Sequence, residues 1–312
     1  MYHFIVNPNA SSGKGRKAWS EAEQILKAEG VSYTVHFPED PEESEALVRS
    51  LTSTEGPEEC HLVVVGGDGT LNTVLQGINR FDTTKLSLLR MGSANDFAED
   101  MKLSGDISEA LRHLLREPEE ITLDYGVMTC RRLRRQEETI ERRFLISSGI
   151  GFDADICAGI LRSPLKNILN RLSLGRMTYL LEGLRLLFFR KSTRASILIE
   201  GEEPLYVDRL FMAVGMIHRF EGGGVPFCPD ADPRDGLLDI CLVEKMPKWK
   251  LLLAVLLVYR RKHTMLKGVK LCRGRKVTVI TERSQWFHMD GETSFRVRKL
   301  DLECRSGLRF IY

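Results

Sequence analysis

The feature that most constrains this chain is a glycine-rich turn directly after a short apolar run. The apolar run His61–Val65 has the pattern of a buried strand, and it leads into Gly66-Gly67-Asp68-Gly69-Thr70-Leu71-Asn72. The glycines allow a sharp turn and a close approach of several backbone N–H groups to a bound anion. A helix beginning near Thr70 would point the positive end of its dipole at the same place. The sequence therefore predicts a phosphate site between a strand and a helix.

Asp68 lies inside this turn and refines the prediction. A carboxylate repels a bare phosphate, so its presence predicts a divalent cation between the two groups. The alternative is a tight strand-to-helix turn in which the aspartate serves only as a cap. The length of the glycine-rich string and its place after a buried strand favour phosphate binding.

Two more polar loops follow predicted strands. Asn7-Pro8-Asn9-Ala10-Ser11-Ser12-Gly13-Lys14-Gly15 comes after the strand expected at Tyr2–Asn7, and Gly92-Ser93-Ala94-Asn95-Asp96-Phe97 comes after Leu86–Arg90. The first loop is not a Walker motif, because Gly15 stands where that motif has Ser or Thr. Ligands of open parallel sheets bind outside the carboxyl ends of the strands. We therefore expect the three loops to form one site.

The pattern of elements changes near residue 125. Before it, strand-like and helix-like segments alternate, which predicts an α/β domain over residues 1–125 with a parallel sheet covered on both faces. After it, strand-like segments dominate, which predicts a mainly antiparallel β-sandwich over residues 126–312. Two helices, Met177–Phe189 and Trp249–His263, are expected to interrupt these strands, whereas Arg283–Met289 has no regular pattern. The sequence leaves open whether the last strands return to the first domain.

Composition excludes several classes of protein. Lys and Arg number 45 against 43 Asp and Glu, so the net charge of +2 does not indicate a dedicated nucleic-acid binder. The seven cysteines are scattered without a CxxC pair, which supports neither a zinc ribbon nor a disulfide framework. The longest apolar run, Leu251–Val258, is far shorter than the roughly 20 residues of a spanning helix. We expect a reduced, cytoplasmic chain.

The three loops also carry a family resemblance. NPNASSGKG, GGDGTLN and GSANDFA, in this order, resemble the soluble bacterial diacylglycerol kinase-like lipid kinases, whose catalytic domain sphingosine and ceramide kinases share. The resemblance continues through Gly149–Ala154, Gly222–Gly224, Pro229–Val243 and Asp290-Gly291-Glu292. NAD kinases and phosphofructokinases share the GGDGT element, so the resemblance implies their α/β fold for the first domain. The DGLLD and DGE elements favour the lipid kinases.

The resemblance implies a role for individual residues. Those implied or expected to contact ATP are Asn7, Asn9, Ser11, Gly66, Gly67, Asp68, Gly69, Thr70, Leu71, Asn72 and Ser93. It further implies an acidic network around the catalytic Mg²⁺ made of Asp68, Asp96 and Asp124. Glu292 would be the general base that accepts the proton of the attacking hydroxyl. The threonine with which many relatives contact the nucleotide has no clear equivalent in Val35–Asp40, so adenine contacts are not implied.

A second, structural Mg²⁺ is implied in the second domain. Its ligands would be the Asp235 carboxylate and the main-chain oxygens of Asp232 and Leu237. Carboxylate and carbonyl oxygens suit a hard cation, but an Asp-Gly pair between strands is also a common hairpin turn. His218 and His288 lie near motifs, yet lone histidines are more often ordinary core or surface residues, and Glu292 has the better claim to the base role.

The resemblance implies transfer of the γ-phosphate of ATP to a lipid hydroxyl, most simply diacylglycerol to phosphatidic acid. The alternatives are another lipid such as phosphatidylglycerol or a sphingoid base, a soluble substrate such as NAD, or a nucleotide-binding regulator without catalysis. The combination of the acidic residues with Glu292 argues against the regulator, since a pure binder needs no base.

The expected partner is a lipid at a membrane surface. Trp249–His263 ends in an aromatic residue followed by basic ones, which suits the membrane interface, although the helix could equally pack on the sandwich. The arginines at positions 131–143 are either attracted to anionic lipid or form a solvated hairpin tip. No nucleic-acid partner is expected, and the chain could form a homodimer.

Overall fold

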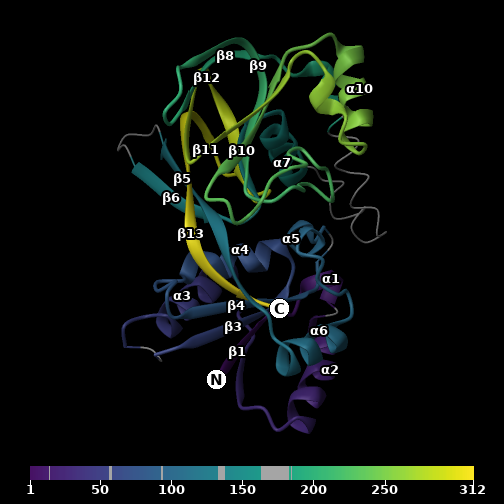
Figure 1. The fold of residues 1–312 in the computed structure, drawn as a ribbon, viewed down its shortest axis with the longest axis vertical. Helices are drawn as coiled ribbons and strands as arrows, with labels where there is room; N and C mark the ends of the chain where they lie inside the picture. The colour runs from purple at the N-terminus through teal and green to yellow at the C-terminus, as the bar shows by residue number, and fades with distance from the viewer. Residues whose placement is uncertain (14, 56–57, 93, 133–137, 163–182, 184) are drawn as a thin grey trace. The chain divides into compact units, whose positions relative to one another are not determined.

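The computed structural model describes residues 1–13, 15–55, 58–92, 94–132, 138–162, 183 and 185–312, with only the backbone of residues 11, 12, 132, 161 and 162. They form two compact units. The first unit is Met1–Asp124 together with Ser306–Tyr312, and the second is Tyr125–Arg305. The yellow end of the chain in Figure 1 therefore belongs with the purple and blue elements of the first unit.

The first unit contains a sheet of parallel strand pairs. Its strands are β1 (Tyr2–Val6), β2 (Tyr33–His36), β3 (Cys60–Gly66), β4 (Thr84–Arg90) and the end of β13 (Arg296–Ile311). Their order across the sheet is β2, β1, β3, β4 and β13, and each neighbouring pair runs in parallel. The carboxyl ends of β1, β3 and β4 therefore lie at one edge, where the three polar loops begin.

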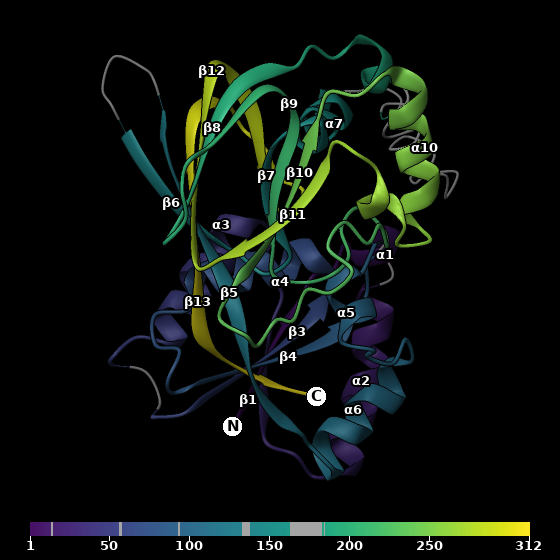
Figure 2. The same cartoon turned by 45° about the horizontal axis from the view of Figure 1, so that its top comes forward.

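The helices of the first unit cover this sheet. They are α1 (Ala10–Gly13), α2 (Gly15–Ala28), α3 (Pro41–Leu51), α4 (Asp68–Gly77), α5 (Asp96–Asp100) and α6 (Ile107–Arg116). Trp19 and Leu26 of α2 join Leu111 of α6 in a core with Phe4 and Val63 of the sheet, and Figures 1 and 2 show α2 beside α6. Helix starts follow local chemistry, since Asp40 accepts a hydrogen bond from Glu43 N at the start of α3.

The second unit is antiparallel. Its strands are β5 (Glu120–Arg132), which begins in the first unit, β6 (Glu138–Phe144), β7 (Ser147–Gly151), β8 (Thr193–Ile199), β9 (Leu205–Met216), β10 (Leu238–Glu244), β11 (Val269–Gly274), β12 (Lys276–Met289) and most of β13. Both β9 and β12 pair with β8 at one end and with β7 at the other, so these four strands form a closed circuit. Figure 2 shows β8 next to β9 and β12. The circuit encloses an apolar core that includes Ile150, Ile197, Leu210 and Val279.

Several elements of the second unit differ from the sequence prediction. Helix α7 (Phe152–Arg162) and strand β11 were not predicted. Strand β12 continues to Met289, although Arg283–Met289 was expected to be irregular. Its first half pairs with β8 and its last residues pair with β7, and its register against β13 shifts between Ile280 and Gln285.

Two predicted helices also differ. Helix α10 (Lys248–Val258) is shorter than the predicted Trp249–His263, and a short 3₁₀ turn follows at His263–Met265. The predicted helix Met177–Phe189 falls mostly outside the described residues, but Gly183 and Arg185–Phe189 are helical. None of the helices in the described ranges is both long enough and apolar enough to cross a membrane.

Candidate functional site

The three polar loops of the first unit contact one another. Asn7 Nδ2 donates to Thr70 Oγ1 at 3.0 Å, which joins the loop after β1 to the glycine-rich turn. Met91 N donates to Gly66 O at 2.6 Å, which joins that turn to the loop after β4. A Cβ at Gly67 would lie 2.9 Å from the Cα of Gly92, so only glycine allows this approach. The loops that the sequence singled out thus form one continuous surface.

The glycine-rich turn enters its helix earlier than predicted. Helix α4 begins at Asp68 with Gly67 as its N-cap, whereas the sequence placed the helix start near Thr70. Leu71 N donates to Gly67 O at 3.0 Å, and its side chain is buried. Leu71 therefore uses its N–H and its side chain within the protein, and its nucleotide contact stays a prediction. Asn72 is also buried, where its Oδ1 accepts from Gln76 Nε2 at 3.0 Å.

The Asp68 carboxylate links two of the loops. It accepts hydrogen bonds from Asp96 N at 2.9 Å and Phe97 N at 3.4 Å, so it caps α5 rather than its own helix α4. Asn95, just before α5, has a left-handed backbone with φ of 56°, and its Nδ2 donates to Gly92 O. Asp68 therefore does act as a helix cap, as the alternative in the sequence analysis supposed, but it caps a helix that is distant in the sequence. The carboxylate is held in one orientation at the meeting point of the loops.

The other predicted residues of the first unit have distinct environments. Asn9 N donates to Asn7 Oδ1 at 2.9 Å, which closes the turn before α1. Asp96 is 4% exposed and Asp124 is fully buried at the point where β5 leaves the first unit. Ser93 lies outside the described residues, as does the side chain of Ser11.

The DGE element of the second unit forms a turn at the end of β12. Asp290 and Gly291 have positive φ values of 45° and 82°, and Met289 and Glu292 pair across the turn. Glu292 is exposed, but desolvation by the surrounding protein and then the Asp290 charge raise the pKa of its carboxyl, which Arg142 partly opposes. A raised pKa makes Glu292 a stronger base than an ordinary glutamate.

Asp290 holds this turn against the segment between β6 and β7. Its carboxylate accepts the backbone N–H groups of Leu145, Ile146 and Ser147 at 2.9, 2.9 and 3.0 Å. This contact also explains why the strand predicted at Arg143–Ser147 is split, since these amides bond to Asp290 instead of a neighbouring strand. The first residue of the DGE element is thus a structural cap.

The proposed ligands of a structural cation lie in one turn. Asp235 N donates to Asp232 O at 3.4 Å, and Asp235 Oδ1 accepts from Leu237 N at 3.0 Å. The second oxygen of Asp235 lies 3.8 Å from an Arg273 nitrogen. One carboxylate and a main-chain carbonyl in one tight turn are of the type that a hard cation binds, so the residues fit such an ion.

One cluster in the second unit was missed by sequence reasoning. His288 Nε2 lies 2.9 Å from Asp153 Oδ2 and 3.4 Å from Glu221 Oε1, and all three residues are buried. The histidine was expected to be an ordinary core or surface residue, and the structure places it in a charged cluster. Asp153 lies in GIGFDA and Glu221 precedes Gly222–Gly224, so both adjoin motifs, but no local spacing connects them.

Comparison with known proteins agrees with this arrangement. The diacylglycerol kinase catalytic domain family matches residues 1–128, and the YegS C-terminal NAD kinase β-sandwich-like domain family matches residues 159–301. YtlR of Bacillus subtilis, named as a candidate lipid kinase, is 28% identical over 95% of this chain and 96% of its own length. A Mycobacterium tuberculosis protein named diacylglycerol kinase is 26% identical over 88% of this chain and 83% of its own.

A solved structure shares the fold. A candidate diacylglycerol kinase from Bacillus anthracis superposes with a TM-score of 0.77 at 18% identity, covering 100% of this chain and 96% of that one. At this identity the likeness concerns the fold alone, which is the diacylglycerol kinase and NAD kinase fold with a β-rich C-terminal domain. The chain thus carries a diacylglycerol kinase catalytic domain followed by a YegS C-terminal domain, and along nearly its whole length it is similar to proteins named diacylglycerol kinase or lipid kinase.

Proposed function

We propose that this protein is an ATP- and Mg²⁺-dependent kinase that transfers the γ-phosphate of ATP to the hydroxyl of diacylglycerol and releases phosphatidic acid. The observation that carries the proposal is the meeting of three glycine- and asparagine-rich loops around the Asp68 carboxylate. Relatives named diacylglycerol kinase support the choice of lipid. In this proposal the nucleotide binds to the first unit, and the lipid that accepts the phosphate binds to the second.

The loops of the first unit would bind the nucleotide phosphates. Gly66–Gly69 brings backbone amides and the start of α4 to one place, where the helix dipole favours anions. Asp68, Asp96 and Asp124 would hold Mg²⁺, which neutralises phosphate charge during transfer. The fixed orientation of Asp68 supports this role, because a cation ligand must not rotate away when the nucleotide binds.

Glu292 would act as the general base. As the lipid hydroxyl oxygen forms its bond to the γ-phosphorus and the bond to the ADP oxygen breaks, the hydroxyl proton passes to the Glu292 carboxylate. Its raised pKa favours that transfer, and Asp290 anchors the turn that carries it. Asp235, with the main-chain oxygens of Asp232 and Leu237, would hold a second Mg²⁺ that orders the turn before β10.

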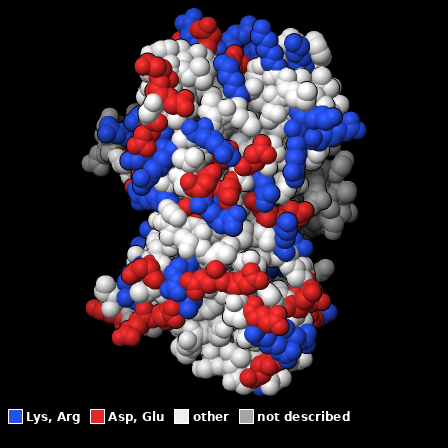
Figure 3. Space-filling model, in the orientation of Figure 1, with Lys and Arg blue, Asp and Glu red and all other residues white. Residues whose placement is uncertain are grey.

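Helix α10 would contact the membrane surface. Trp249, Leu256 and Tyr259 are each 64% exposed, which is unusual for large apolar side chains. Lys248 Nζ donates to Phe188 O at 2.5 Å, so α10 begins beside a second exposed aromatic pair, Phe188 and Phe189. Figure 3 shows white and blue surfaces side by side at this end of the second unit.

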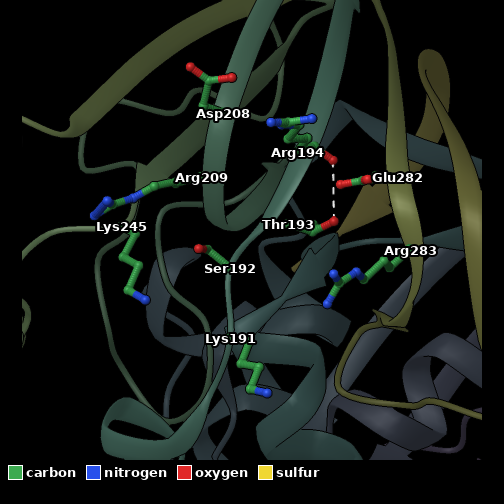
Figure 4. A pocket seen from close by; sticks show the side chains of 9 residues that line it. All are labelled: Lys191, Ser192, Thr193, Arg194, Asp208, Arg209, Lys245, Glu282 and Arg283. Carbon is green, nitrogen blue, oxygen red and sulfur yellow. Dashed lines mark hydrogen bonds between the residues drawn. The ribbon is translucent and has the colours of Figure 1, made fainter.

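A basic pocket lies next to the start of α10. Its volume is about 540 Å³. Figure 4 shows its cationic side chains, which come from four segments of the second unit: Lys191, Arg194, Arg209, Lys245 and Arg283. Within the described part of the chain, none of the five forms an ion pair, and only Asp208 and Glu282 oppose them in the lining. Cations without ion-pair partners beside exposed apolar groups suit an anionic lipid surface. There the apolar side chains are buried at the interface and the cations are attracted to the lipid headgroups.

The substrate is tested with radiolabelled ATP and mixed micelles of diacylglycerol, phosphatidylglycerol, sphingosine or ceramide, with soluble NAD as a further arm. We expect label in phosphatidic acid, and label only in NADP would overturn the lipid proposal.

Glu292→Gln should lower turnover by about 10²–10⁴-fold while ATP affinity is unchanged. Glu203→Gln, at an exposed glutamate of the second unit, is the matched control. A parallel loss of ATP affinity in Glu292→Gln would remove Glu292 from the base role.

Membrane contact is tested by sedimentation with vesicles. We expect binding to vesicles that contain phosphatidylserine and little binding to pure phosphatidylcholine. Arg209→Gln with Lys245→Gln should weaken binding to anionic vesicles without changing turnover on a short-chain, water-soluble diacylglycerol. Equal binding of this double variant and the wild type would refute the proposed surface.

A further inference from the structure

The buried cluster of Asp153, Glu221 and His288 joins three separate segments of the second unit. Asp153 lies in the first turn of α7, Glu221 pairs with Val225 in a loop after β9, and His288 lies near the end of β12. Their exposures are 5%, 8% and 0%. One oxygen or nitrogen atom from each lies within 4.8 Å of the others. The cluster is thus compact and buried, and the proposed reaction does not use it.

The three side chains of the cluster do not balance one another in charge. With both carboxylates ionised, even a protonated His288 leaves these three side chains with a net charge of −1. Burial raises the pKa of the Cys157 and Cys241 thiols, and the nearby charges of Asp153 and Glu221 raise it further, because a thiolate is disfavoured beside carboxylates. Buried charges are normally paired or bind metal ions.

The hydrogen bonding is also incomplete. A single N–H of His288 faces Asp153 Oδ2 at 2.9 Å and Glu221 Oε1 at 3.4 Å, and one proton cannot point at both oxygens. Asp153 Oδ1 is buried without a hydrogen-bond partner among the described residues. An ion with several ligand positions would bind oxygens of both carboxylates at once.

The backbone at Gly149 packs directly against the cluster. A Cβ at Gly149 would collide with Asp153 Oδ2 and lie 3.0 Å from His288 Nε2 and 2.9 Å from Ala213 O. Glycine therefore keeps this side of the cluster free of a side chain. Tetrahedral sites with metal–ligand distances of about 2.0–2.2 Å place their ligand atoms roughly 3.4 Å apart. The distances from His288 Nε2 to Asp153 Oδ2 and Glu221 Oε1 are 2.9 and 3.4 Å.

We propose that Asp153, Glu221 and His288 form a binding site for a transition-metal ion of the Zn²⁺ class. Imidazole nitrogen with carboxylate oxygen is a ligand set of zinc, whereas Mg²⁺ prefers oxygen alone. In the bound form His288 is neutral and its Nε2 lone pair binds the ion, so two carboxylates and a divalent cation balance. The ion ties α7 and the Glu221 loop to the end of β12, two residues before Asp290.

Titration of metal-free protein with Co²⁺ tests the site, because four-coordinate Co²⁺ absorbs visible light far more strongly than the six-coordinate ion of an all-oxygen site. We expect one equivalent of intense absorption, which Zn²⁺ displaces and excess Mg²⁺ does not. Zn²⁺ should also raise the melting temperature of the wild type. Glu221→Gln and His288→Gln should lose the absorption and the Zn²⁺-dependent shift.

Two control variants separate this site from other binding. Asp235→Asn removes a proposed Mg²⁺ ligand, and His113→Gln removes an exposed histidine of α6, so both should keep the Co²⁺ absorption. If His288→Gln fails to fold, the conservative Glu221→Gln still decides the outcome. The proposal is overturned if the wild type shows no intense band, or if the band survives in Glu221→Gln. None of these readouts depends on kinase activity, so they stand apart from the test of the proposed function.

Discussion

Substitutions at Asp290 test how the DGE turn is held. Asp290 Oδ2 accepts the N–H of Leu145, and Oδ1 accepts those of Ile146 and Ser147. All three donor residues are buried, at 1%, 5% and 0% exposure. A hydrogen bond to a charged group contributes about 1.5–3 kcal/mol, and a buried donor left without its acceptor costs about 1–3 kcal/mol.

The expected loss of unfolding free energy differs between the variants of Asp290. Asp290→Asn keeps one side-chain oxygen for Ile146 and Ser147 but turns an N–H₂ group toward Leu145, so it should cost about 1–3 kcal/mol of unfolding free energy. Asp290→Gly loses all three bonds without straining the positive φ of 45°. Because Asp290 is partly exposed and water can reach some donors, we expect a loss of about 3–5 kcal/mol. Asp290→Ala adds about 1 kcal/mol for its left-handed backbone.

The assay is urea unfolding followed by tryptophan fluorescence, to which Trp286 in β12, close to the turn, contributes together with Trp19 and Trp249. Asp208→Asn, at an exposed carboxylate of β9, is the matched control and should remain within about 0.5 kcal/mol of the wild type. The order wild type, Asn, Gly, Ala in decreasing stability is the expected result. If Asn and Gly both unfold with the wild-type midpoint, the Asp290 carboxylate does not hold the turn.

Four further predictions concern single residues. Burial and then the charge of Lys85 lower the pKa of His61 to about 4. As the pH falls, the unfolded chain therefore binds a proton at His61 before the folded chain does, and up to about 3 kcal/mol of stability should be lost between pH 6.5 and 4. The difference in unfolding free energy between pH 7 and pH 5 should be smaller in His61→Asn than in the wild type. The acidic limb of the turnover profile should have a midpoint above the ordinary glutamate pKa, because Glu292 must lose its proton to act as a base. Asp68→Ala should abolish turnover, and near-normal rates would contradict the phosphate site. Asp235→Ala should lower the melting temperature in Mg²⁺ but not in chelator, and an identical Mg²⁺ response would argue against a cation there.

Local sequence determined the parts that depend on near neighbours. Glycines at Gly66 and Gly67, the apolar run before them and the polar loops after β1 and β4 were sufficient to predict strand–turn–helix units. Helix starts such as the one at Asp40 follow from a side chain bonding an amide three residues away. The motifs and their order were also sufficient to indicate the lipid kinase family, since they are short and contiguous.

Tertiary structure alone decided the contacts between distant residues. Ser306–Tyr312 returns to the first unit, where the end of β13 joins β4, and no local pattern distinguishes that strand from the others. Asp68 caps α5 instead of α4, and His288 meets Asp153 across 135 positions of the chain. These contacts depend on strand register and on which loops close over one another. Strand register and loop closure are determined by the burial of the whole core. Residue types at single positions therefore predict the chemistry of a turn but not which distant segment the turn contacts.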